Sequence, residues 1–187
     1  MRLNFTHPFV VRVGLPMAGL FFISVMLLGF VFRASPRNGF ARLVARAFSF
    51  PALRAGGEVV SLDEYYKYEE ALAQWYAFDK ESNAAAALVR DRLMERLIVI
   101  ALERTLAKEY RINVKSKEVA DFSARLSAGV PDFERFLSER YGWSQRDFRQ
   151  LVAEPLALEQ KLRAGISDFE NVLSQRRGIV PVKRYLE

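Results

Sequence analysis

The chain has 187 residues, of which 51% are hydrophobic and 27% are charged, and its 28 Lys and Arg against 22 Asp and Glu give a formal net charge of +6. No acidic residue precedes Glu58, whereas seven arginines do, so the rest of the chain is nearly neutral. Its basic and acidic residues are interleaved there, which excludes a nucleic-acid-binding domain built on a basic stripe. The chain has no cysteine, and its single histidine is His7. These counts exclude disulfides, thiol nucleophiles and a Ser-His-Asp triad within the later domain.

Residues 13–32 contain no charged side chain. A helix of this length spans about 30 Å, the thickness of the hydrocarbon core of a bilayer. We therefore predict a single transmembrane helix at 13–32, preceded by an N-terminal flank at 1–12. A buried core helix and a cleaved signal peptide are the alternatives, but Arg33 interrupts the position where a signal peptide would need its small-residue cleavage site.

Residues 33–57 are predicted to form a basic linker next to the membrane. Apolar residues recur in it from Phe40 to Phe48 with the spacing of one helical face, which predicts a short amphipathic helix. This helix either lies among the lipid headgroups or packs on the domain, and the sequence leaves both alternatives open. Four arginines are candidates for contact with anionic headgroups: Arg33, Arg37, Arg42 and Arg46. Gly56-Gly57 marks a turn.

From Ser61 onward the pattern is helical, so we expect an all-α domain over 58–177 and a short tail at 178–187. Six helices are predicted, over 61–80, 84–110, 116–128, 131–141, 144–163 and 167–177. Three of them begin with a Ser followed three residues later by an acidic residue, the capping-box pattern: Ser61 with Glu64, Ser144 with Asp147, and Ser167 with Glu170.

The 84–110 helix is apolar around most of its circumference, which predicts that other helices enclose it at the centre of the domain. Asn113 is suited to the left-handed conformation that closes such a helix. Pro155 falls inside the 144–163 helix and should kink it near Ala153-Glu154.

Six aromatic residues lie on the 61–80 helix. Most share one arc, typical of a core face, whereas Tyr66 and Phe78 fall outside it. Tyr66, Trp75 and Phe78 are candidates for gripping apolar segments of another polypeptide. The alternative, which is the more common one, is that these rings pack on a neighbouring helix.

No catalytic motif is present: the sequence has no glycine-rich phosphate loop, no Ser nucleophile elbow and no His-Glu-x-x-His. Asp91, Glu95 and Glu103 stand at helical spacing among arginines, which is typical of a solvated, ion-paired face. We therefore expect no enzyme activity, no cofactor and no metal.

Three short segments carry a resemblance to a known family: GGEVVSLDEY at 56–65, KEYRINVKSKEV at 108–119 and FERFLSERYGWSQRDFR at 133–149. Together with the N-terminal anchor, they resemble the N-terminal domain of SurA-type chaperones over roughly residues 56–163. The resemblance implies a helical domain that binds unfolded polypeptides outside the cytoplasm. Many relatives continue into a parvulin-type prolyl isomerase domain built around histidines, but only 24 residues follow Arg163 here, without His or Cys.

The resulting hypothesis is a single-pass, non-catalytic, chaperone-like protein of the cell membrane. Its helical domain would bind unfolded or extracytoplasmic polypeptides, its linker would contact lipid, and nucleic acid would not be a partner. The numbers of arginines on the two sides of 13–32 slightly favour a cytoplasmic domain. The resemblance favours a domain outside the cytoplasm, and we follow the resemblance. The alternative is a membrane-tethered structural module that docks one specific protein or self-associates.

Overall fold

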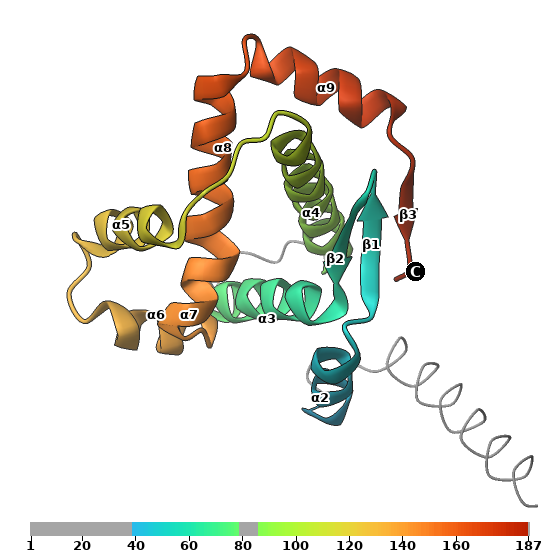
Figure 1. The fold of residues 1–187 in the computed structure, drawn as a ribbon. Coiled ribbons are helices and arrows are strands. Elements are labelled where there is room, and N and C mark those ends of the chain that lie inside the picture. The colour runs from blue at the N-terminus through green and yellow to red at the C-terminus, as the bar shows by residue number, and fades with distance from the viewer. Residues whose placement is uncertain (1–38, 79–85, 187) are drawn as a thin grey trace, which may run out of the picture.

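The computed structural model describes residues 39–78 and 86–186 (Figure 1). The predicted flank at 1–12 and transmembrane helix at 13–32 lie outside these residues, as do Arg33 and Arg37. Within the two described ranges, no helix combines the length and the apolar character needed to cross a bilayer.

Most of the described chain is helical, but the predicted all-α class is wrong because a small sheet is present. The helices are α2 (Gly39–Phe48), α3 (Leu62–Phe78), α4 (Ala86–Glu109), α5 (Ser116–Ser127), α6 (Phe133–Tyr141), α7 (Gln145–Phe148), α8 (Glu154–Gly165) and α9 (Phe169–Ile179). A π-helical turn, η1 (Arg149–Ala153), joins α7 to α8. The strands are β1 (Pro51–Ala55), β2 (Glu58–Ser61) and β3 (Val182–Arg184).

The sheet has the order β2-β1-β3, and both pairings are antiparallel. β1 and β2 form a hairpin in which Ala55 pairs with Glu58 across Gly56-Gly57. Gly56 has a φ of 60°, and a Cβ on it would lie 3.2 Å from Thr105 Oγ1 on α4. A Gly-Gly pair between two short apolar runs is a hairpin signal. Because the runs that flank Gly56-Gly57 are so short, the sequence predicts a turn there and no strands.

The C-terminal tail completes this sheet. Leu53 of β1 pairs with Arg184 of β3, and the Tyr185 amide donates to the Ala52 carbonyl at 3.0 Å. Residues 178–187 were predicted as a separate tail, but α9 extends to Ile179 and a strand follows. Figure 1 shows this C-terminal strand beside β1, at the far end of the sheet from β2.

The predicted central position of the longest helix is confirmed. α4 contacts β1, β2, α3, α8 and α9, and in Figure 1 these elements surround it. Its apolar side chains are almost completely buried, among them Leu97, Ile100, Leu102 and Leu106. A helix that is apolar on nearly all sides is stable only when it is covered in this way.

Pro155 changes the helix near the predicted place. The chain forms the π-helical turn η1 immediately before α8, whose second residue is Pro155. Proline has no N–H to donate to the carbonyl four residues earlier, which belongs to Leu151. The Tyr68 hydroxyl on α3 donates a hydrogen bond to that carbonyl. A side chain from another helix thus replaces the donor that proline lacks.

The left-handed residue that closes α4 is Arg111, with a φ of 54°, and not Asn113 as predicted. The Arg111 amide donates to the Lys108 carbonyl at 3.3 Å, and the Ile112 amide donates to the Ala107 carbonyl at 2.8 Å. These two bonds form a Schellman motif. Its geometry turns the chain back so that Ile112 packs against the core cluster of Ala107, Leu162 and Phe169.

Two of the three predicted capping boxes have their serine bond. The Ser61 hydroxyl accepts from the Glu64 amide at 3.1 Å, and Ser144 and Asp147 cap each other reciprocally. Ser167 forms no such cap, because α9 begins at Phe169 after Asp168, whose φ of 56° is left-handed.

The predicted amphipathic helix is α2. Val44 and Ala45 are buried, and the helix contacts α3. Phe40, Leu43 and Phe48 are 55%, 67% and 64% exposed. Packing on the domain is therefore confirmed for the part of α2 around Val44 and Ala45, while three large apolar residues of the same helix stay exposed.

Candidate functional site

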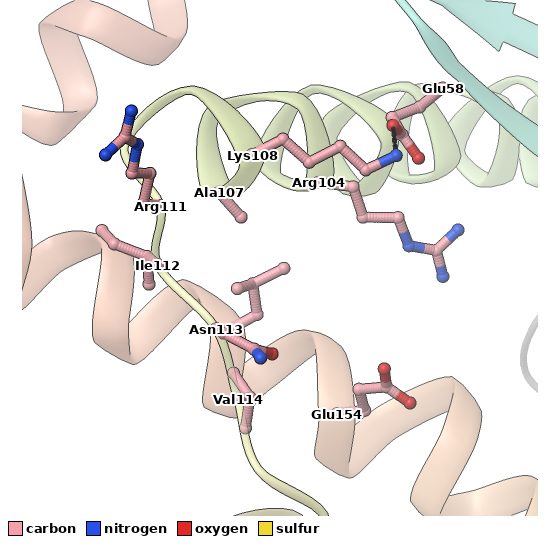
Figure 2. Close-up of a pocket in the computed structure, with 10 residues that line it drawn as sticks. Glu58, Arg104, Ala107, Lys108, Arg111, Ile112, Asn113, Val114 and Glu154 are labelled. Atoms are coloured by element: carbon pink, nitrogen blue, oxygen red, sulfur yellow. Dashed lines mark hydrogen bonds and ion pairs between the residues drawn. The ribbon is translucent and has the colours of Figure 1, made fainter.

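A cleft with a volume of about 450 Å³ lies between α4 and α8. Its apolar lining comes from Ala107 on α4, Ile112 and Val114 on the α4–α5 link, and Leu158 on α8. Figure 2 shows the link running past α8, with Arg104 and Glu154 extending into the space between the two helices. The volume falls within the roughly 300–1,000 Å³ typical of ligand-binding clefts.

A second cleft of about 330 Å³ adjoins the first. Val114 and Glu154 line both clefts. The second cleft continues between α5 and the α7–η1 segment, where Val119, Arg146 and Arg149 line it. We call the two clefts together the link groove. Val114 on the α4–α5 link lies where the two clefts adjoin.

The link from Ile112 to Lys115 contains no helix or strand, and its last residue, Lys115, has an extended backbone with a φ of −77° and a ψ of 149°. The Asn113 carbonyl accepts a hydrogen bond from Lys161 Nζ at 2.8 Å. Among the described residues, the backbone amides of Asn113 and Val114 donate to no acceptor. An extended segment with unpaired amides can pair with a second extended chain, as the edge of a sheet does.

Charged groups ring the groove, and some of them are already paired. The Arg104 guanidinium donates to both oxygens of Glu64, at 2.9 and 3.3 Å. Burial disfavours its charge, but the Glu64 carboxylate outweighs burial and raises the pKa of Arg104. Lys108 pairs with Glu58. Within the described part of the chain, the Arg111 side chain makes no hydrogen bond or ion pair and is available to a ligand, whereas the Glu154 carboxylate makes no hydrogen bond but attracts Arg104 through its charge.

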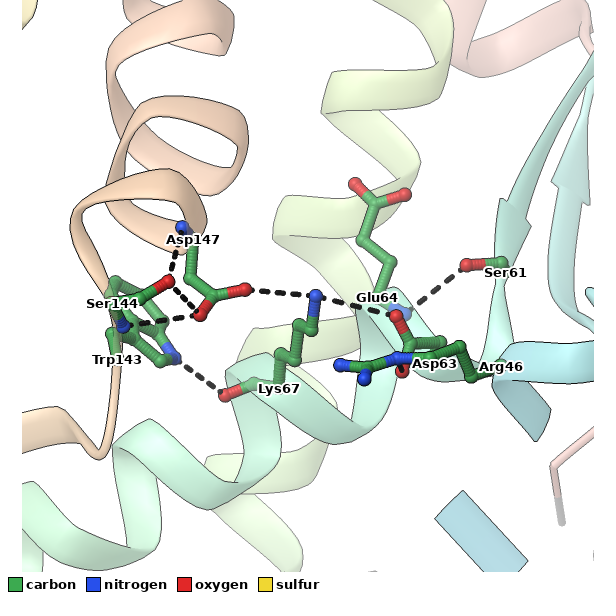
Figure 3. Close-up of polar contacts among 8 residues, drawn as sticks. All are labelled: Arg46, Ser61, Asp63, Glu64, Lys67, Trp143, Ser144 and Asp147. Atoms are coloured by element: carbon green, nitrogen blue, oxygen red, sulfur yellow. Dashed lines mark hydrogen bonds and ion pairs between the residues drawn. The ribbon is translucent and has the colours of Figure 1, made fainter. Parts of the chain in front are cut away.

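A chain of polar contacts joins α3 to α7 (Figure 3). Lys67 on α3 lies 3.4 Å from the Asp63 carboxylate and 2.9 Å from that of Asp147 on α7. Burial raises the pKa of the Asp147 carboxyl, but hydrogen bonds from Ser144 and Lys67 outweigh burial and lower it below its ordinary value. The Trp143 indole donates to the Lys67 carbonyl at 3.2 Å. These contacts hold the start of the α7–η1–α8 segment against α3.

Glu103 is not on a solvated face, contrary to the prediction. It is 1% exposed, and its Oε2 has no hydrogen-bond partner among the described residues. Burial raises its pKa to about 7, while Arg96 and Arg163 oppose this rise and Glu159 and Glu170 reinforce it. The other two residues predicted for that face are unlike Glu103. Asp91 is exposed, and Glu95 pairs with Arg177 and Arg184 from the C-terminal segment.

The candidates predicted for peptide binding do not line the link groove. Tyr66 is 3% exposed and belongs to the core, because α3 is covered on more sides than a single apolar arc implies. The side chains of Trp75 and Phe78 lie outside what the structure describes. Those two remain predictions.

Of the arginines predicted to contact lipid, Arg46 has a described side chain. It is 72% exposed, and its Nε lies 3.7 Å from Asp63 Oδ1. Arg42 belongs to α2, but its side chain lies outside the described part.

Sequence reasoning missed the link groove, although one signal pointed to it. Ile112-Asn113-Val114 alternates apolar and polar residues between two helices, which is the pattern of a short extended segment. Its partner walls on α8 come from residues more than 40 positions further along the chain. Only the fold brings them together.

No protein-family model matches the chain, and comparisons with curated proteins and with solved structures find no significant similarity. In residues 39–78 and 86–186, no group of three or more acidic or histidine side chains is arranged to hold a metal ion. The groove's own chemistry is therefore the basis for assigning a function.

Proposed function

We propose that this protein is a membrane-anchored, non-catalytic, chaperone-like protein that binds extended segments of unfolded polypeptides in the link groove. The main support is the Ile112–Lys115 link, which has no helix or strand, has two amides without an acceptor among the described residues, and lines a partly apolar groove. Pairing with backbone groups does not depend on the client's sequence, whereas apolar walls favour segments that are buried in folded proteins. Both properties suit a binder of unfolded chains.

The charge of the domain supports the same proposal. Residues 58–187 are nearly neutral, so long-range electrostatic attraction contributes little to recruitment. Local contacts with Arg111, Arg146 and Glu154 would select among clients at short range. The resemblance to SurA-type chaperones is consistent with this role, and from it we propose that the domain lies outside the cytoplasm. A reporter fused after Glu187 tests that placement, and a cytoplasmic reporter signal would contradict it.

The direct test is to fill the groove. Val114→Trp places a large ring where the two clefts meet, and Val130→Trp makes the same change at a half-buried position between α5 and α6. We expect the full chain in detergent to bind fluorescent unfolded polypeptides and to slow their aggregation. Val114→Trp should weaken that binding by about tenfold or more, equivalent to about 1.4 kcal/mol, and Val130→Trp should leave it unchanged.

Two results would contradict the proposal. One is unchanged binding by Val114→Trp. The other is saturable binding to a single folded protein with no response to unfolded clients, which would favour the alternative of a membrane-tethered docking module.

A further inference from the structure

Helix α2 carries a patch of exposed apolar residues that the groove does not use. Phe40 and Leu43 lie on one face of the helix, Phe48 lies at its C-terminal end, and each of the three is more than half exposed. Phe48 stacks on Phe50 with ring centroids 5.8 Å apart, and Phe50 packs against the main core. The patch is therefore braced on the folded domain and keeps a fixed orientation relative to it.

The position of α2 in the chain restricts what can cover this patch. The uncharged stretch 13–32 ends seven residues before Gly39. Seven residues reach at most about 25 Å when fully extended. If 13–32 spans the bilayer, as proposed above, α2 is confined to the vicinity of the membrane surface whatever path the connection takes.

The charge around the patch matches that location. No acidic residue occurs before Glu58. Arg46 lies at the C-terminal end of α2 with a side chain 72% exposed, and its contact with Asp63 is long, at 3.7 Å. Lys67 also neutralises Asp63, at 3.4 Å. The Arg46 guanidinium is thus free to leave this loose pair for a lipid phosphate at little cost, since exposed ion pairs contribute little to stability.

We infer that α2 lies in the membrane interface, with Phe40, Leu43 and Phe48 inserted at the boundary between headgroups and acyl chains and Arg46 on anionic headgroups. Amphipathic helices of this kind bury their apolar face roughly 5–10 Å into that boundary. Because Val44 and Ala45 hold α2 on α3, insertion would fix the orientation of the domain above the bilayer. The inference rests on the proposed span of 13–32 and not on peptide binding.

The absence of cysteine from the chain allows a clean test. Single variants Leu43→Cys, Phe48→Cys and Leu126→Cys each carry one fluorescent label; Leu126 is the control, 42% exposed on α5. The full chain is reconstituted into phosphatidylcholine–phosphatidylglycerol vesicles containing lipids spin-labelled near the headgroup end of the acyl chain. We expect quenching at 43 and 48 to exceed that at 126 by roughly twofold or more. Arg46→Gln should reduce the part of this quenching that depends on phosphatidylglycerol.

The outcomes separate this inference from the proposals on which it stands. Equal quenching at 43, 48 and 126, in protein that resists alkaline extraction from the vesicles, overturns the interfacial helix and leaves the span standing. Shielding of 43 and 48 from water without lipid quenching also overturns it, in favour of a protein partner or a second copy. Protein that alkali extracts completely overturns the span and the inference together. Val114→Trp should leave the quenching unchanged, which keeps peptide binding independent.

Discussion

Two neighbouring residues of α4 meet opposite environments. Arg104 faces α3, where Glu64 accepts two hydrogen bonds from its guanidinium. Glu103 lies among charged side chains of α8 and α9, is almost completely buried, and has one oxygen without a partner in the described structure. Both sides of α4 are covered by packing, but only the α3 side provides matching polar groups. Removing the partner of a buried charge lowers stability, and a buried charge that lacks a partner is itself held at the expense of stability.

The largest effect is expected from neutralising Glu103. A folded-state pKa of about 7 means that the folded chain binds a proton between about pH 5 and pH 7 that the unfolded chain has released. Stability therefore falls as pH rises through this window. Glu103→Gln should remove that dependence and be more stable than the parent at pH 8 by on the order of 3 kcal/mol.

Denaturant unfolding followed by Trp143 fluorescence measures this difference, because Trp143 is buried between α6 and α3. Glu134→Gln, at an exposed position on α6, is the control. The unfolding free energies of the parent chain and Glu103→Gln are compared at pH 5 and at pH 8. If the difference between them is the same at both pH values, the contrast between the two sides of α4 is wrong.

Removing the carboxylate on the α3 side of α4 should lower the unfolding free energy instead of raising it. Glu64→Gln leaves the Arg104 guanidinium without its carboxylate, although the cleft still gives that guanidinium some contact with water. We expect a loss of about 1–2 kcal/mol in unfolding free energy. Combining Glu64→Gln with Arg104→Met in a double-mutant cycle isolates the pair. A coupling energy near zero would mean that pairing does not distinguish the two sides.

The hydrogen bond from the Tyr68 hydroxyl to the Leu151 carbonyl is a third case, in which the buried group that needs a partner belongs to the backbone. Tyr68→Phe removes the hydroxyl that supplies the donor missing at Pro155. A loss of about 1–2 kcal/mol is expected, because a buried carbonyl is left unsatisfied. In the double variant Tyr68→Phe with Pro155→Ala, the new backbone amide can replace the hydroxyl, so the cost of Tyr68→Phe should shrink. An unchanged cost would contradict this account of η1.

The smallest effect on stability is expected at the C-terminal end of α4. Arg111 holds a left-handed conformation that costs a non-glycine residue roughly 1 kcal/mol. Arg111→Gly should therefore stabilise the fold by about 0.5 kcal/mol, after allowance for the extra freedom of glycine in the unfolded chain. Thermal unfolding would record a small rise in the midpoint, and Asn113→Gly should not reproduce it.

Helix positions and several caps could be predicted from local pattern alone. The spacing of apolar residues in α4 and the serine caps at Ser61 and Ser144 depend on neighbours within one or two turns. The sheet was missed because its strands are 5, 4 and 3 residues long, and β3 comes from a segment more than 120 residues away from β1. Pairing between such distant segments leaves no periodic trace in either one.

Four features can be predicted from the sequence without the fold: a largely helical domain, an apolar helix at its centre, a distortion at Pro155 and a basic, acid-free N-terminal region. Each follows from residue spacing or charge within one segment. Only the packing of distant elements shows that Tyr66 is buried, that Glu103 Oε2 has no hydrogen-bond partner among the described residues and that the α4–α5 link lines a groove with α8. Burial and pairing depend on which distant elements cover a residue, and local spacing carries no information about those neighbours.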